Sequence, residues 1–277
     1  MLGVIKEALR CLGPSSQRAD IAACAAVAAL LAMSTPAMAG DVPLVALSSV
    51  APHIRQDMRY AGAGNFTGKP VPGYEAGACW LRPAVAQALA LADRELADQS
   101  PPLALEVLDC YRPRRAVAAF GVWARAAEDG RTRHYYPNVA RNDLIAHGYI
   151  ARTSTHSRGI AVDLTIVKRH GGQAGGKSSA GTPAPAASIA LPCTEPGATG
   201  GAWDAIDMGS AFDCFDPKSH ADHPDLTREQ RAARQTLRRV MQKHGFAAYA
   251  KEWWHFTFPA ADDGRSFDVP VRAAPAR

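Results

Sequence analysis

The segment Gly159-Ile160-Ala161-Val162-Asp163-Leu164-Thr165-Ile166 decides the fold, because its side chains alternate strictly between two classes. The even positions are aliphatic, whereas the odd positions carry small or polar side chains. Successive residues of a strand point to opposite faces of a sheet, so this pattern predicts a strand with one apolar face on the core. Asp163 then points toward a cleft or solvent. Such strands suit a mixed or antiparallel sheet with one solvated face.

Two further segments have strand character. Trp254, Phe256 and Phe258 alternate with His255 and Thr257, which repeats the pattern of the first segment. Residues 103–108 form a short apolar run that predicts a buried strand. The sequence therefore supplies at least three strands for one sheet.

Three helices are interleaved with these strands. Residues 83–98 have an apolar face at helical spacing, and Pro113 opens a second helix that should stop near Gly130. The third, over 227–244, begins with a capping box and is followed by Gly245. We expect a single α+β domain with a mixed or antiparallel sheet, helices packed on one side and the functional site on the open face.

Residues 1–39 have the pattern of a secretory signal peptide. A positive leader precedes the apolar run 21–33, and the small-x-small motif Ala37-Met38-Ala39 predicts cleavage before Gly40. The alternative is an uncleaved membrane anchor, although the apolar run is shorter than a bilayer requires. We expect a secreted or periplasmic domain over 40–277 that is not inserted in the membrane after cleavage.

Composition limits the function classes and the compartment. A formal net charge of +5 over 277 residues, without a dense basic block, gives no basis for nucleic-acid binding. Four of the six cysteines follow the leader, and an even number in an exported chain predicts two disulfides. Three pairings are open, of which we favour Cys79–Cys110 with Cys193–Cys214. The Gly/Ala/Ser/Pro-rich stretch 170–201 is expected to be a flexible insertion within the domain.

Polar residues on the two alternating segments suggest a metal centre. His156 precedes the first strand, and a turn after it would bring the imidazole toward Asp163, while His255 occupies the polar face of the other. Two imidazoles and one carboxylate are a natural catalytic zinc set with one position left for water. Glu252 is the candidate base, although an ideal strand would place it opposite His255, so the backbone must be irregular there. One histidine alone is more often structural than a ligand; the joint pattern supports the metal.

These same residues carry a resemblance to a known family. The segment 154–165 together with Glu252-Trp253-Trp254-His255 closely resembles the VanX-type D-alanyl-D-alanine dipeptidases, a group of zinc peptidases that includes D,D-carboxypeptidases. The likeness extends over most of the chain after the leader, through Asn65-Phe66-Thr67-Gly68-Lys69-Pro70, Tyr111-Arg112-Pro113 and Tyr135-Tyr136-Pro137-Asn138. The long stretch 170–201 and the four cysteines depart from the family pattern.

The resemblance implies a role for each matching residue. His156, Asp163 and His255 match the ligands of one zinc ion per chain, and Glu252 matches the base. Arg112 matches the arginine that stabilises the tetrahedral intermediate, with a structural salt bridge to Asp109 as the alternative. The matches for the substrate pocket, which could equally be loop and turn residues, are Tyr60, Ser154 and Asp213.

The resemblance also implies the reaction. We expect hydrolysis of D-alanyl-D-alanine to two D-alanines, in cell-wall peptide turnover or D-alanine salvage. A D,D-carboxypeptidase acting on longer stem peptides is the nearest alternative. A zinc-dependent protein that binds cell-wall fragments without cleaving them is a second alternative from a different class. The sequence leaves the oligomeric state and the strictness for the second D-alanine open, and another divalent ion could occupy the same ligands.

Overall fold

A computed structural model describes residues 44–169, 191–195 and 205–274. The predicted signal peptide, 1–39, and nearly all of the stretch 170–201 lie outside the described residues. Within the described ranges, no helix combines the length and the apolarity needed to cross a membrane.

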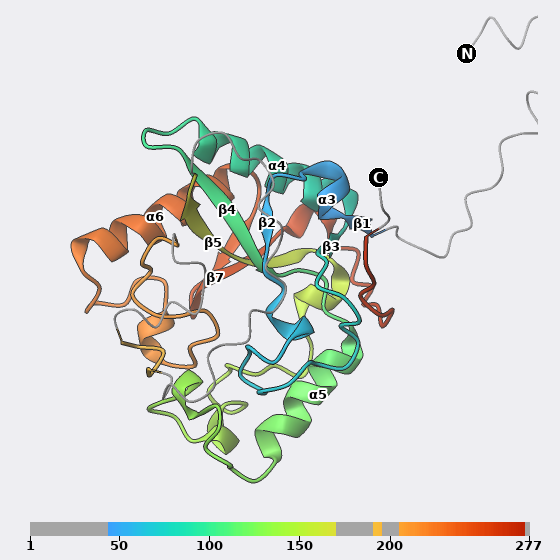
Figure 1. Cartoon of the computed structure of the whole chain (residues 1–277), viewed down its shortest axis with the longest axis vertical. Helices are drawn as coiled ribbons and strands as arrows, with labels where there is room; N and C mark the ends of the chain where they lie inside the picture. The colour runs from blue at the N-terminus through green and yellow to red at the C-terminus, as the bar shows by residue number, and fades with distance from the viewer. Residues whose placement is uncertain (1–43, 170–190, 196–204, 275–277) are drawn as a thin grey trace, which may run out of the picture. The chain divides into compact units, whose positions relative to one another are not determined.

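A five-stranded mixed sheet forms the centre of the domain, in the order β2-β4-β5-β7-β6 (Figure 1). The strands are β2 (Arg55–Gln56), β4 (Leu103–Asp109), β5 (Ala161–Lys168), β7 (Glu252–Thr257) and β6 (Ala247–Tyr249). β2 runs parallel to β4, and every other pairing is antiparallel. The predicted α+β class and mixed sheet are therefore confirmed.

The faces of the sheet differ from the prediction in one respect. β5 has Val162, Leu164 and Ile166 on its apolar face, toward α6, as its alternation predicted. The opposite face is not solvated, because Asp163 is only 2% exposed and Thr165 5% exposed. The short helix η2 lies against β4, and residues of the segment 205–212 line a small pocket together with Thr165. The alternation therefore predicted which side chains are polar, but not that they are exposed to water; Asp163 lies against two histidines instead.

Two of the three predicted helices match their expected bounds. α4 (Pro83–Ala97) packs on β4, and α6 (Arg228–Lys243) begins with the predicted capping box of Thr227 and Gln230. α5 (Arg114–Arg125) ends five residues before Gly130, so its predicted end was wrong. Glu128 accepts hydrogen bonds from the Gly130 backbone and the Tyr136 hydroxyl, which pulls the chain into a loop.

Several short elements carry too few residues for a periodic pattern, and the sequence did not predict them. β1 (Val45–Ala46) and β3 (Trp80–Leu81) form a separate antiparallel pair, and α3 (Leu47–Val50) follows β1. The single-turn 3-10 helices are η2 (Arg59–Ala61), η3 (Arg133–Tyr135), η4 (Arg141–Asp143), η5 (Thr155–Arg158), η6 (Pro217–Ser219) and η7 (Pro259–Ala261).

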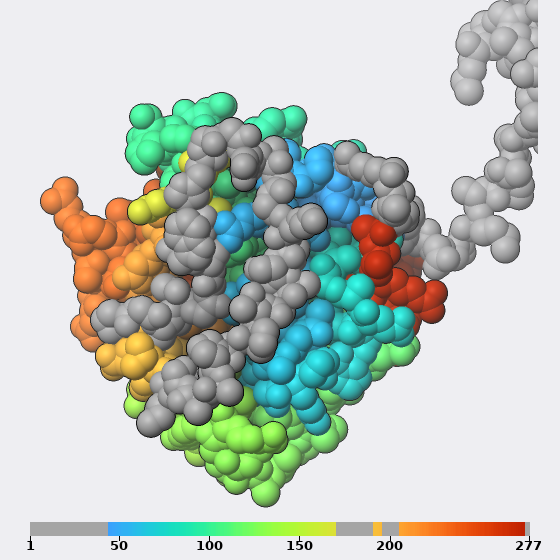
Figure 2. Space-filling model, in the orientation of Figure 1, coloured from blue at the N-terminus to red at the C-terminus, as the bar shows by residue number. Residues whose placement is uncertain are grey.

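Two disulfides and the C-terminal segment connect elements that are distant in the sequence. The favoured disulfides Cys79–Cys110 and Cys193–Cys214 are both present. The C-terminal segment, red in Figure 2, lies along the surface beside the teal residues that precede β3. The backbone N–H of Glu75 donates to the Val271 carbonyl there.

Candidate functional site

The first site residue is positioned by a single-turn helix and a glycine. His156 lies in η5, where its backbone N–H donates to Ser154 Oγ at 3.2 Å. Gly159 ends η5 in the left-handed conformation, with φ of 69°, which glycine adopts without steric penalty. The chain reverses at this residue into β5, as the predicted turn required. The imidazole of His156 is thereby placed beside Asp163.

The strand register places the other two residues. Asp163 of β5 and His255 of β7 are directly opposite partners, so both side chains lie on the same face of the sheet. Asp163 Oδ1 lies 3.2 Å from His156 Nε2 and 3.0 Å from His255 Nδ1. One ligand atom from each of the three residues falls within 4.8 Å of the others. This group has the composition and spacing to hold a metal ion.

The outer nitrogen of each imidazole also has a hydrogen-bond partner. These contacts show whether the three residues suit a metal ion. His156 Nδ1 lies 2.6 Å from the Cys110 carbonyl oxygen, which can only accept, so Nδ1 carries the proton. His255 Nε2 can donate to Thr257 Oγ1 at 3.3 Å. In that state, lone pairs of both imidazoles face a carboxylate in a buried space. Such second contacts are typical of metal-ligating histidines, so the residues fit the ion.

Electrostatics at this point favour a positive charge. Burial opposes ionisation of Asp163, but the two imidazoles outweigh burial and hold the pKa of that carboxyl well below its usual range. Burial likewise opposes charging of His255, yet hydrogen bonding and attraction to Asp163 raise its pKa. The same negative potential would stabilise a bound cation.

Glu252 reaches the site because the backbone is irregular where the sequence required it. The β6–β7 register shifts between Ala248 and Tyr249, so that Tyr249 pairs with Glu252. Glu252 Oε2 lies 3.9 Å from His255 Nδ1, on the same side as the metal group. Burial raises the pKa of Glu252 to about 7, partly offset by His255. A carboxyl with that pKa can both accept and return a proton near neutral pH.

Arg112 combines a structural salt bridge with a position in the pocket. Its Nε donates to Asp109 Oδ2 at 2.9 Å, which is the alternative that the sequence left open. Its Nη2 also lies 3.4 Å from Asp163 Oδ2, and its guanidinium packs 5.1 Å from the ring centres of Tyr60 and Phe120. Asp109 therefore holds the arginine beside the metal group.

Tyr60 and Asp213 form a second polar pair in the same pocket. The Tyr60 hydroxyl lies 3.0 Å from both carboxylate oxygens of Asp213, and both residues are buried. Asp213 has φ of 59°, and among the described residues no other non-glycine residue has a positive φ. Burial, reinforced by the charge of Asp163, raises the pKa of Asp213 well above its usual value.

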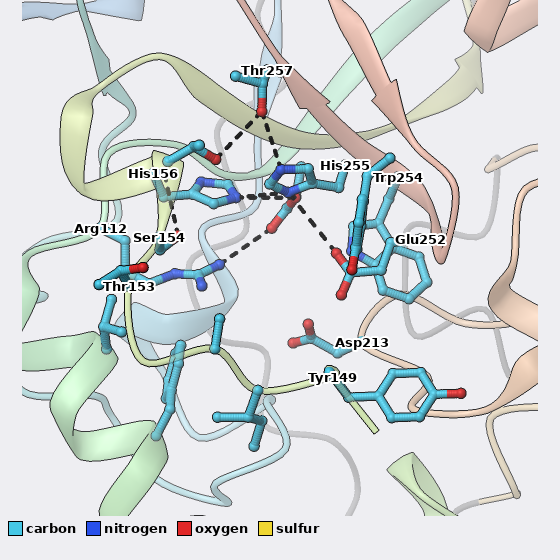
Figure 3. Close-up of a pocket in the computed structure, with 18 of the residues that line it drawn as sticks. Arg112, Tyr149, Thr153, Ser154, His156, Asp213, Glu252, Trp254, His255 and Thr257 are labelled. Carbon is cyan, nitrogen blue, oxygen red and sulfur yellow. Dashed lines mark hydrogen bonds and ion pairs between the residues drawn. The ribbon is translucent and has the colours of Figure 1, made fainter. Parts of the chain in front are cut away.

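All eight predicted site residues line one cavity of about 360 Å³. In the view of Figure 3, Arg112 and Glu252 lie on opposite sides of the imidazole pair, and Asp213 lies across the open space below it. Other lining residues were not predicted as site residues: Tyr149, Thr153, Thr155, Trp254 and Thr257. Thr257 could have been found, because its alternation places it on the polar face with His255. The contribution of the Cys110 carbonyl has no sequence signal, because every residue has one.

Comparison with known proteins gives a consistent family match. The model of a family described as D-ala-D-ala dipeptidase, within the M15 peptidases, matches residues 41–176 and 199–272. A D-alanyl-D-alanine dipeptidase of Streptomyces coelicolor is 36% identical over 236 residues, which is 84% of this chain and all of the relative. One from Enterococcus faecium is 33% identical over 84% of this chain and all of the relative. One from Escherichia coli is 28% identical over 81% of this chain and 89% of the relative.

Proposed function

The chain belongs to the D-ala-D-ala dipeptidase family of M15 peptidases, and from this premise we propose that it hydrolyses D-alanyl-D-alanine to two D-alanines. The observation that carries the proposal is the convergence of His156, Asp163 and His255 beside Glu252 in one pocket. The named activity of the relatives in Streptomyces and Enterococcus supports the same substrate.

The proposal includes one zinc ion per chain, held by His156, Asp163 and His255. Bound there, zinc would polarise the peptide carbonyl and acidify a water molecule. Two imidazoles with a single carboxylate favour zinc over magnesium or calcium, which prefer sites made of oxygen ligands.

Glu252 acts as the general base and then as the general acid. Its carboxylate accepts a proton from the water that attacks the peptide carbonyl, and the protonated carboxyl then donates it to the leaving amine. Its buried carboxyl lies 3.9 Å from His255 Nδ1, so it is placed to exchange a proton with a water molecule in the pocket. Arg112 stabilises the oxyanion that develops on the carbonyl, since a guanidinium fixed by Asp109 needs no reorganisation during the reaction.

The substrate is oriented by the polar pair and by the loop before η5. Asp213, oriented by the Tyr60 hydroxyl, would pair with the free ammonium of the dipeptide, whose positive charge would favour the ionised carboxylate that burial disfavours in the empty pocket. Such a pairing favours dipeptides, because the same position in a longer peptide is an uncharged amide. Ser154 Oγ, at the start of η5, completes the proposed substrate contacts.

The cellular role follows from the proposed export of the chain. We assign residues 1–39 to a signal peptide, 40–277 to the dipeptidase domain and 170–201 to an insertion, so the enzyme would act in the periplasm or outside the cell. The two disulfides agree with an oxidising compartment. There the reaction would serve cell-wall peptide turnover or D-alanine salvage.

The deciding experiment measures D-alanine release from D-alanyl-D-alanine by the zinc-loaded mature protein. Glu252→Ala should lower kcat by at least about 100-fold with zinc content unchanged, because it removes the base and no ligand. Glu229→Ala, an exposed carboxylate on α6, is the matched control and should keep full activity. No release by the zinc-loaded parent would refute the dipeptidase assignment.

Two alternatives give different results in the same assay. A D,D-carboxypeptidase would release D-alanine from a pentapeptide stem, whereas the proposed enzyme should act only on the free dipeptide. A binding protein would retain D-alanyl-D-alanine without cleaving it. The position of Glu252 beside the metal group argues against the second alternative.

A further inference from the structure

The backbone around Cys110 holds His156 at two points. The Cys110 carbonyl accepts the hydrogen bond from His156 Nδ1 at 2.6 Å. Two residues later, the backbone N–H of Arg112 donates to the His156 carbonyl at 3.2 Å. Residues 110–112 therefore fix both the ring and the backbone of one proposed metal ligand.

The sheet does not extend far enough to hold this segment. The β4–β5 register shifts between Val107 and Asp109, and β4 ends at Asp109. Beyond that residue, the Tyr111 N–H donates to the Trp80 carbonyl, and Cys110 is bonded to Cys79. The first contact connects the segment to β3, and the second connects it to Cys79, the residue directly before that strand.

Cys79 is itself a firm anchor. Its side chain and that of Cys110 are fully buried. Its backbone N–H donates to Gln56 Oε1 at 2.9 Å, and its carbonyl accepts from the Leu47 N–H at 2.9 Å. The disulfide thus joins a well-bonded residue to the one whose carbonyl contacts His156.

We propose that the Cys79–Cys110 disulfide is a positioning element for the metal site, which keeps the Cys110 carbonyl against His156 Nδ1. With the proton held on Nδ1, the Nε2 lone pair stays directed at Asp163 and His255. Without the disulfide, the carbonyl can move away and the imidazole can rotate or change tautomer. This inference rests on the proposed function, because it presupposes that His156 is a metal ligand.

The test compares zinc affinity in two double variants of the full mature protein. Cys79→Ala with Cys110→Ala should bind zinc about 10- to 100-fold more weakly, as expected when a contact that orients a metal ligand is lost. Cys193→Ala with Cys214→Ala is the matched control, since it removes the other disulfide without touching a metal ligand. Its affinity should stay within about threefold of the parent, well below the effect of losing an orienting contact.

Competition with a chromophoric chelator gives the affinities, and far-UV circular dichroism checks that each variant is folded. Unchanged affinity in the folded Cys79/Cys110 variant would overturn the inference, as would equal losses in both variants. A parent that binds no zinc would instead overturn the proposed metal site, which separates the two failures.

A second measurement covers the case in which the alanine pair does not fold. Cys79→Val with Cys110→Ala fills more of the buried space that the disulfide occupies in the parent. This variant should show the same loss of zinc affinity, about 10- to 100-fold, in the same chelator competition. Unchanged affinity in the folded variant would contradict the proposal.

Discussion

At the scale of single residues, the site depends on where protons are held. To bind a metal, the three proposed ligands must present acceptor atoms to it, and this requires that the outer nitrogen of each imidazole carries the proton. A backbone carbonyl does this for His156, and the hydroxyl of Thr257 can do it for His255. The two histidines are thus oriented by chemically different partners. The Thr257 hydroxyl can be removed by substitution, whereas the Cys110 carbonyl cannot, and Asp109 Oδ2 lies farther from His156 Nδ1, at 3.5 Å.

Thr257→Val should weaken zinc binding by about 10- to 100-fold, the usual effect of losing a contact that orients a ligand. Valine keeps the shape and the β-branching, so the free energy of unfolding of the metal-free protein should change little. Chelator competition measures the affinity. Thr155→Val is the control and should have a clearly smaller effect, because within the described part of the chain Thr155 Oγ1 is hydrogen-bonded to the Thr257 hydroxyl, at 3.3 Å, and not to a histidine. Equal effects of both variants would argue against a specific contact with His255.

At the scale of elements, the site is built where regular structure ends. η5 and β5 meet at Gly159, β4 leaves the sheet at Asp109, and the β6–β7 pairing shifts beside Glu252. In regular strands, successive side chains point to opposite faces of the sheet. These irregularities instead bring several functional side chains to the same face. The left-handed turn at Gly159 reverses the chain within a short distance, since it lies three residues after His156 and four residues before Asp163.

Gly159→Ala tests that turn. An L-residue in the left-handed conformation costs about 1–2 kcal/mol, and an added Cβ would lie 2.5 Å from Leu44 Cδ2, so that side chain must shift. We expect a loss of about that size in the free energy of unfolding, measured in urea, together with weaker zinc binding. Gly64→Ala is the matched control, because no atom lies within 4 Å of its added Cβ and its φ is not positive. A loss no larger than that of the control would contradict the argument.

These elements also mark how far sequence could predict the fold. Long periodic segments such as α4, α6 and β5 were predictable, because their packing repeats over many residues. The strands of two or three residues were not, because they are stabilised by pairing rather than by any local pattern. The solvated face was wrongly expected for a related reason: a pattern of polar residues does not reveal whether they face water or one another.

The site residues were easier to predict from the sequence than the backbone contacts that position them. Ligand chemistry is visible in side chains, so His156, Asp163 and His255 could be proposed directly, and the structure brings them together. The spacing of Glu252 even required the irregular backbone that is found. The Cys110 carbonyl and the left-handed Asp213 were not predictable, because they depend on how distant segments pack.

At the scale of the whole molecule, the site gathers residues that are far apart in the sequence. The pocket draws on residues from Tyr60 to Thr257, which come from both sides of the predicted insertion. Each proposed ligand lies on a different element, η5, β5 or β7. The unfolded chain would hold these groups far apart, so a metal bound by all three should bind the folded state selectively.

Removal of the metal should therefore destabilise the entire domain. A ligand present at about 100 times its dissociation constant stabilises the folded state by about 2.7 kcal/mol. For a domain of this size, that corresponds to a fall in Tm of roughly 5–10 °C when a chelator removes the zinc. Differential scanning calorimetry with and without chelator measures the difference.

Two variants make this measurement specific to the proposed ligands. His255→Ala should lower the Tm of the zinc-treated protein and abolish most of its response to the chelator. His147→Ala, at an exposed histidine outside the pocket, should respond as the parent does. If the chelator does not change the Tm of the parent, the folded domain does not bind zinc at the proposed site. A response that survives in His255→Ala would place the metal on other residues, since loss of one of three ligands cannot leave the affinity intact.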